Sequence, residues 1–145
     1  MKPFKDIEKE MRAYEIGPLE KLAVQDAVII IAVYAAQIDP QNSEEDIKRI
    51  EALAEQCPLC VERKEGILSR INRFVNLLRT IDSEKAIEAV IKVLDPESRK
   101  EAFKLAAEVV ISGDKPPIKK REILDKLARK LSVDNQFAEK IINKE

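Results

Sequence analysis

The segment Ala27-Val28-Ile29-Ile30-Ile31-Ala32-Val33-Tyr34-Ala35-Ala36 is the most apolar stretch of the chain and decides its fold. Asp26 precedes the segment and Gln37 follows it. Its ten residues fall well short of the ~20 that a membrane-spanning helix needs. A helix that is apolar on every side must be surrounded by protein. We therefore expect this segment to be the buried central helix of a bundle.

The composition of the whole chain favours an all-α fold. The 145 residues fit a single domain spanning 1–145, and 45% of them are hydrophobic while 37% are charged. Only three are Gly, whereas the helix formers Ala, Leu, Glu, Lys and Ile dominate. Few clusters resemble a strand followed by a hairpin turn. We predict an all-α globular bundle of seven or eight helices.

Apolar residues spaced three or four positions apart, with capping residues before them, indicate where the helices lie. Asp95-Pro96 is a strong start signal, because Asp is a good N-cap and Pro suits the first helical position. Loops are expected at Asp39–Asn42 and Ser112–Pro117. The expected helices cover or begin at Phe4–Tyr14, Leu19–Gln37, Ser43, Ile67–Leu78, Asp82-Ser83, Pro96–Val110, Ile123–Leu131 and Ser132-Val133-Asp134.

An internal repeat relates the two halves of the sequence. A shift of 74 positions places the Asp39-Pro40 loop on Gly113-Asp114 without a gap. The same shift places Leu53-Ala54 on Leu127-Ala128, so helix and loop positions coincide. The sequence therefore predicts two related halves, at about 19–80 and 83–145.

Each half carries a similar motif around its loop. The first copy reads Ala35-Ala36-Gln37-Ile38-Asp39-Pro40 through Asp46 to Leu53-Ala54, and the second reads Val110-Ile111-Ser112-Gly113-Asp114 through Glu122 to Leu127-Ala128. This pattern resembles the repeated motif of the tellurite-resistance TerB family. The Asp-Gly of that family is replaced by Asp-Pro in one copy and by Gly-Asp in the other. The resemblance implies an all-helical domain, a role in stress response, and cation binding through loop acids.

Five acidic residues near the two loops are candidate metal ligands. Carboxylates grouped in this way could hold a hard divalent cation such as calcium or magnesium, which prefers oxygen ligands. The same residues would also serve as helix caps that complement the helix dipole, and both interpretations stay open at the sequence level. The candidates are Asp39, Glu45, Asp46, Asp114 and Glu122.

The residue that enzymes use most often for acid–base catalysis is missing from the sequence. The chain has no His, which removes the commonest general acid or base near neutral pH and the commonest transition-metal ligand. There is no Gly-rich phosphate loop and no Gly-x-Ser-x-Gly motif. The net charge of −1 provides no overall field toward nucleic acid or anionic lipid. We predict a protein that is not an enzyme.

The motif Cys57-Pro58-Leu59-Cys60 has three interpretations. The cysteines could be structural, with Cys57 in the core as the repeat suggests. They could be redox-sensitive, because a thiolate is stabilised at a helix start. They could also supply two of the four ligands of a zinc ion shared between two chains.

Two basic segments suggest alternative partners. The C-terminal pair of helices, Lys119–Lys144, resembles a helix-turn-helix, although Asp134 and Glu139 would oppose phosphates. The amphipathic segment Arg63–Arg79 could lie on a membrane surface or in a partner's groove, but its apolar stripe is what a bundle helix needs. The basic residues of the first segment are Lys119, Lys120, Arg121, Lys126, Arg129 and Lys130.

Taken together, these patterns predict a non-catalytic TerB-like binding or stress-response domain with a divalent cation at its two acidic loops. The alternatives are a nucleic-acid-binding regulator that uses the C-terminal helices, and a pure protein-interaction domain. We expect a protein partner and no membrane insertion. The N-terminal residues lack an apolar signal region and the chain has only two Cys, so a cytoplasmic location is expected.

Overall fold

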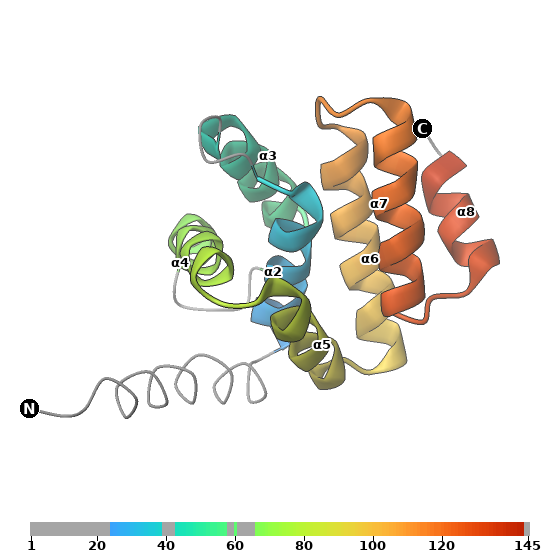
Figure 1. The fold of residues 1–145 in the computed structure, drawn as a ribbon, viewed down its shortest axis with the longest axis horizontal. Coiled ribbons are helices and arrows are strands. Elements are labelled where there is room, and N and C mark those ends of the chain that lie inside the picture. Colours follow the sequence, from blue (N-terminus) through green and yellow to red (C-terminus); the bar gives the residue numbers. More distant parts are fainter. Residues whose placement is uncertain (1–23, 39–42, 58–59, 61–65, 144–145) are drawn as a thin grey trace, which may run out of the picture.

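The computed structural model describes residues 24–38, 43–57, 60 and 66–143. These ranges contain seven α-helices and no strand, which confirms the all-α fold (Figure 1). The helix expected at Phe4–Tyr14 and the expected helix start at Leu19 lie outside the described residues. The helices are α2 (Val24–Ala36), α3 (Ser43–Glu55), α4 (Ile67–Thr80), α5 (Ser83–Val93), α6 (Pro96–Ile111), α7 (Pro117–Lys130) and α8 (Asn135–Asn143).

The apolar segment that decides the fold forms α2, at the centre of the molecule. Residues 27–32 of this helix are completely buried, as the absence of a polar side predicts. Helix α6 packs beside α2 and buries Ala102, Phe103 and Ala106 against the same core. The central pair α2–α6 is therefore the scaffold on which the other helices lie.

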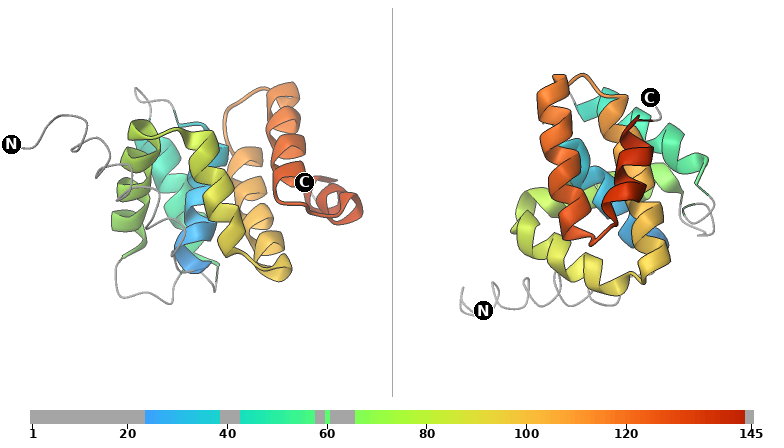
Figure 2. Two further views of the ribbon diagram at one scale, coloured as in Figure 1. Left: turned by 60° about the horizontal axis from the view of Figure 1, so that its bottom comes forward. Right: turned by 90° about the vertical axis from the view of Figure 1, so that its right-hand side faces the viewer.

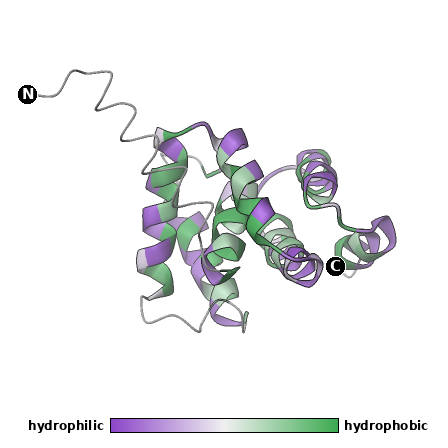
Figure 3. Ribbon diagram, turned by 90° about the horizontal axis from the view of Figure 1, so that it is seen from below, coloured by the Kyte–Doolittle hydropathy of each residue, from purple (hydrophilic) through white to green (hydrophobic). Residues whose placement is uncertain are grey.

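The remaining helices cover the two sides of this pair. Helices α3 and α4 contact each other and α2, and α5 also packs on α2. Helices α7 and α8 pack on α6, on the side away from α4 (Figures 1 and 2). Hydrophobic positions face the neighbouring helices, and hydrophilic positions gather on the outer sides (Figure 3). None of the helices α2–α8 combines the length and the apolar character that crossing a bilayer requires.

Aspartate side chains predicted from the sequence cap the N-termini of α5 and α6. The carboxylate of Asp95 accepts a hydrogen bond from the Ser98 amide at 2.7 Å, with Pro96 at the first helical position. The carboxylate of Asp82 caps α5 by accepting from the amides of Glu84 and Lys85. These contacts confirm the predicted starts of α5 and α6, because each satisfies amides that the helix itself leaves unpaired.

The helix boundaries agree in part with the predicted repeat. A shift of 74 positions carries α2 onto residues 98–110, within α6, and carries α3 onto 117–129, within α7. The same shift carries the start of α4 to residue 141, near the end of α8, so the third helices do not coincide. The origin of the two halves as repeats stays a prediction.

Candidate functional site

A groove lies where the end of α2 meets α4, α5 and α7. Its volume is about 380 Å³, and it combines an apolar floor with charged side chains at its edge. Helices α2 and α7 are far in sequence from each other and from the consecutive pair α4–α5, so only the packing of the bundle creates the groove. The lining residues are Val33, Tyr34, Gln37, Ile38, Val75, Leu78, Arg79, Ser83, Glu84 and Lys126.

Glu84 is the centre of a polar cluster at the edge of this groove. The Tyr34 hydroxyl donates a hydrogen bond to Glu84 Oε1 at 2.8 Å. Lys126 Nζ donates to the same oxygen at 3.2 Å, and Lys130 Nζ lies 2.7 Å from Oε2. Lys126 and Lys130 are one turn apart on α7 and so reach one carboxylate together. The cluster joins α2, α5 and α7.

This cluster shifts the pKa values of Glu84 and Tyr34 in opposite directions. Hydrogen bonds from Lys130 and then Tyr34 lower the pKa of Glu84 from 4.5 to about 2. Burial, followed by the hydrogen bond to Glu84, raises the pKa of Tyr34 from 10.0 to about 12. At neutral pH Glu84 is therefore a carboxylate and Tyr34 a neutral phenol.

Arg79 gives the groove a positive charge that no side chain in the described ranges neutralises. It is exposed in the last turn of α4 and makes no ion pair or hydrogen bond within the described part of the chain. Val33, Val75 and Leu78 supply apolar surface beside it. A guanidinium next to an apolar floor can bind a carboxylate that is attached to an apolar group.

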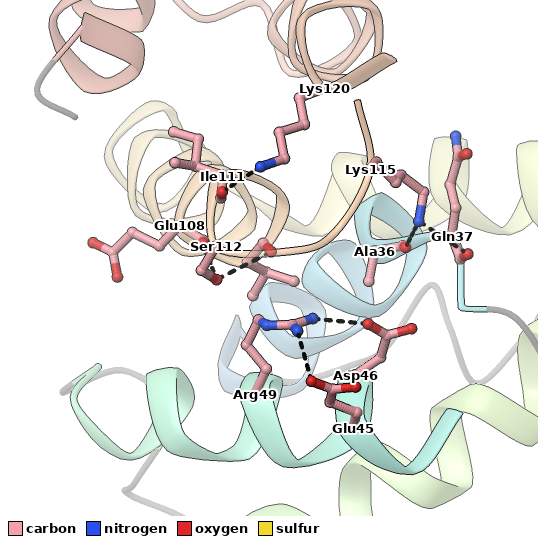
Figure 4. Close-up of polar contacts among 11 residues, drawn as sticks. Ala36, Gln37, Glu45, Asp46, Arg49, Glu108, Ile111, Ser112, Lys115 and Lys120 are labelled. Atoms are coloured by element: carbon pink, nitrogen blue, oxygen red, sulfur yellow. Dashed lines mark hydrogen bonds and ion pairs between the residues drawn. The ribbon is translucent and has the colours of Figure 1, made fainter. Parts of the chain in front are cut away.

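The predicted metal ligands lie elsewhere, and the described ones already have cationic partners or are exposed. Asp46 accepts a hydrogen bond from Arg49 Nη1 at 2.8 Å, and Glu45 lies 3.9 Å from Arg49 Nη2 (Figure 4). Glu122 lies 4.0 Å from Lys119 Nζ, and Asp114 is exposed. Asp39 lies outside the described residues.

The C-terminal ends of α2 and α6 lie near each other, and lysine side chains donate hydrogen bonds to carbonyl oxygens at both ends. Lys115 Nζ donates to the carbonyl oxygen of Ala36 at 2.8 Å, and Lys120 Nζ donates to that of Ile111 at 2.7 Å (Figure 4). Arg49 of α3 also lies close to Gly113, which follows α6: a Cβ atom placed on this glycine would be 3.6 Å from Arg49 Nη1. Within the described ranges no group of three acids or cysteines could hold a metal, and the divalent cation stays a prediction.

Sequence analysis missed a buried ion pair between α2 and α4. Arg70 Nε donates to Asp26 Oδ1 at 2.8 Å, with both side chains at most 3% exposed. Arg70 Nη1 also donates to the carbonyl oxygen of Cys60 at 2.7 Å. A signal was present, because Arg70 occupies the apolar stripe of its helix between Ile67 and Phe74. The expectation that α4 is a core helix is confirmed.

Most of the basic side chains on the C-terminal helices form contacts within the protein. Arg121 pairs with Glu139 and Asp125, and Lys126 and Lys130 pair with Glu84. A basic side chain that is already paired contributes less to phosphate binding. This arrangement weakens the support for the nucleic-acid alternative.

Comparison of the chain with protein-family models, with curated proteins and with solved structures returned no significant match.

Proposed function

We propose that this protein is a non-catalytic binding domain of the TerB-like kind, and that its ligand is a protein partner. In this proposal the groove between α2, α4, α5 and α7 receives a partner segment that carries a carboxylate next to apolar side chains. The observation that supports the proposal most is Arg79, an exposed guanidinium without an internal partner in the described ranges, beside an apolar floor.

The charges around the groove favour an acidic segment. Glu84 is the one acid among the groove-lining residues, and two lysines and a tyrosine already bind it. It therefore repels an incoming carboxylate less than an unpaired acid would. Arg79 remains available for a charge-assisted hydrogen bond, which is stronger than a neutral one. At about 380 Å³ the groove has room for a few side chains of a peptide.

The titration behaviour of the groove supports a binding role over a catalytic one. A general acid or base works best when its pKa lies near the operating pH. Glu84, with a pKa of about 2, and Tyr34, with a pKa of about 12, are both far from neutrality. Neither group exchanges a proton readily at neutral pH, so the cluster is better suited to holding Tyr34 and Lys126 in place.

The test is binding of a defined peptide by fluorescence anisotropy at low ionic strength. The probe is a fluorescein-labelled peptide in which leucine and glutamate alternate. We expect Arg79→Glu to weaken its binding at least about tenfold, because a charge-assisted bond is lost and a repulsion is introduced. The binding should also weaken as salt is added.

The matched control is Lys92→Glu. Lys92 and Arg79 are both basic residues in the last turn of a helix, but Lys92 lies at the far end of α5 from Glu84. This control makes the same change in net charge and should alter the dissociation constant less than about twofold. Equal losses in the two variants, or equal binding of a leucine–lysine peptide, would contradict the proposal. So would absence of binding of the leucine–glutamate peptide.

A further inference from the structure

Cys57 and Cys60 differ in their access to solvent. Both are thiols and not a disulfide. Cys60 is completely buried in the core, whereas Cys57 is partly buried and lines a cleft of about 150 Å³ between α3 and α6. The other residues that line this cleft are Leu53, Gln56, Glu101, Lys104, Leu105 and Glu108. A small molecule in the cleft would therefore meet Cys57 and not Cys60.

A hydrogen-bonded turn holds the two cysteines close together. The amide of Cys60 donates to the carbonyl oxygen of Cys57 at 2.9 Å. Such a turn keeps its first and last Cα atoms within about 7 Å, near the range of about 4.4–6.8 Å that a disulfide spans. Arg70, anchored by Asp26, donates to the carbonyl oxygen of Cys60 at 2.7 Å and ties the turn to α4.

We infer that Cys57 and Cys60 form a thiol–disulfide exchange site for a small zwitterionic disulfide such as oxidised glutathione. The Cys57 thiol loses its proton, and the thiolate attacks one sulfur of the disulfide. The sulfur–sulfur bond breaks, and the first glutathione leaves as a thiolate that takes up a proton. Cys60 then loses its proton and attacks Cys57 Sγ, the bond between Cys57 Sγ and the glutathione sulfur breaks, and the second glutathione leaves as a thiolate that takes up a proton. Two protein thiols are oxidised and one disulfide is reduced to two thiols.

The different environments of Cys57 and Cys60 give them different roles in the exchange. Cys57 attacks first because it faces the cleft, where Lys104 and the acids Glu101 and Glu108 complement the carboxylates and ammonium groups of a zwitterion. The hydrogen bond that the Cys60 thiol donates to Cys57, followed by burial, raises the pKa of the Cys60 thiol well above its usual range. Cys60 therefore stays protonated until the mixed disulfide has formed beside it.

Mass spectrometry of the full chain treated with oxidised glutathione tests the inference. We expect the wild-type protein to lose both alkylatable thiols and to retain no glutathione. Cys60→Ala should retain one glutathione on Cys57, because the second step is removed. In Cys57→Ala, Cys60 should react at least about tenfold more slowly than Cys57 does in Cys60→Ala, since burial blocks it. Lys104→Glu should slow the first step about threefold compared with Lys92→Glu.

Other outcomes would overturn the inference. They are retention of two glutathiones by the wild type, equal reactivity of the two single variants, and a folded wild type that does not react. Circular dichroism checks that each variant keeps its helical content. Timed alkylation of the unmodified wild type gives a second readout that needs no substitution, and Cys57 should be labelled before Cys60. Labelling in the reverse order would contradict the inference.

Discussion

At the scale of single residues, Glu84 connects three helices through one carboxylate. Its carboxylate, on α5, contacts Tyr34 of α2 and both Lys126 and Lys130 of α7. The tyrosine hydroxyl is a donor in this contact, so the hydrogen bond exists only while the phenol is neutral. Burial is the main reason why the pKa of Tyr34 rises, and the loss of this hydrogen bond and the repulsion from Glu84 on ionisation raise it further.

The titration of Tyr34 is a direct measure of this cluster. The folded pKa of about 12 lies above the ordinary value of 10.0, so the cluster contributes stability below pH 10 that is lost as the pH rises toward 12. The chain has two tyrosines, and Tyr14→Phe leaves Tyr34 as the single phenol. Phenolate absorbance should then show a midpoint near 12 that Glu84→Gln lowers. A midpoint near 10 in the folded protein would contradict this account.

The Asp26–Arg70 pair is the second feature that acts through individual side chains. Removing one partner leaves the other as a buried charge, so Arg70→Met should lower the free energy of unfolding by about 3–5 kcal/mol. The double variant Asp26→Leu with Arg70→Met removes both charges and should be less destabilised than Arg70→Met alone. Urea unfolding of the single and double variants measures the coupling. Additive losses would show that the two side chains do not depend on each other.

At the scale of elements, the end of α7 has an unusual backbone. Ser132 has a φ of 54°, in the left-handed region that favours glycine. The amide of Ser132 donates to the Arg129 carbonyl, and the amide of Val133 donates to that of Ala128. These two bonds form the Schellman arrangement that commonly ends helices, with a serine at the glycine position.

Replacing this serine should therefore stabilise the protein. We expect Ser132→Gly to raise the free energy of unfolding by about 0.5–1 kcal/mol, because the left-handed conformation costs glycine no steric strain. The control is Ser112→Gly at the end of α6, where φ is −77° and the serine hydroxyl donates to the Glu108 carbonyl oxygen at 2.7 Å. That control should be destabilising. Thermal unfolding compares the two variants, and a loss of stability in Ser132→Gly would refute the expectation.

At the scale of the whole molecule, basic side chains connect the end of α2 and helix α3 with the loop between α6 and α7. Lys115, in the loop before α7, binds the end of α2, and Arg49 of α3 lies against Gly113 in the same loop. Lysine and arginine at helix C-termini neutralise the carbonyl end of the helix dipole. Lys115 and Arg49 therefore place positive charge near the acidic loops, as a bound divalent cation would do.

Calcium and magnesium provide the corresponding test. Because Arg49 and Lys115 already bind the oxygens of Asp46 and Ala36, we expect millimolar calcium or magnesium to leave the melting temperature unchanged. Asp46→Asn and Asp39→Asn serve as comparisons. A rise in the melting temperature of the wild type that disappears in these variants would establish the cation site that the sequence predicts.

The sequence predicted the elements much better than the site. Asp82, Asp95 and Pro96 marked helix starts correctly, because capping depends on residues two or three positions away. The groove could not be predicted in the same way. Tyr34, Arg79 and Lys126 meet there from three helices, and no local pattern relates their positions.

Local sequence patterns are enough to specify an all-α bundle around the segment Ala27–Ala36, since periodicity and capping act over a few residues and need no knowledge of the partner helix. Only the tertiary structure decided that Arg70 faces Asp26 inside the core, and that Arg79 borders a groove without an internal partner in the described ranges. The physical reason is that the free energy of a charged side chain depends on which distant helix packs against it, and that choice is made by the bundle as a whole.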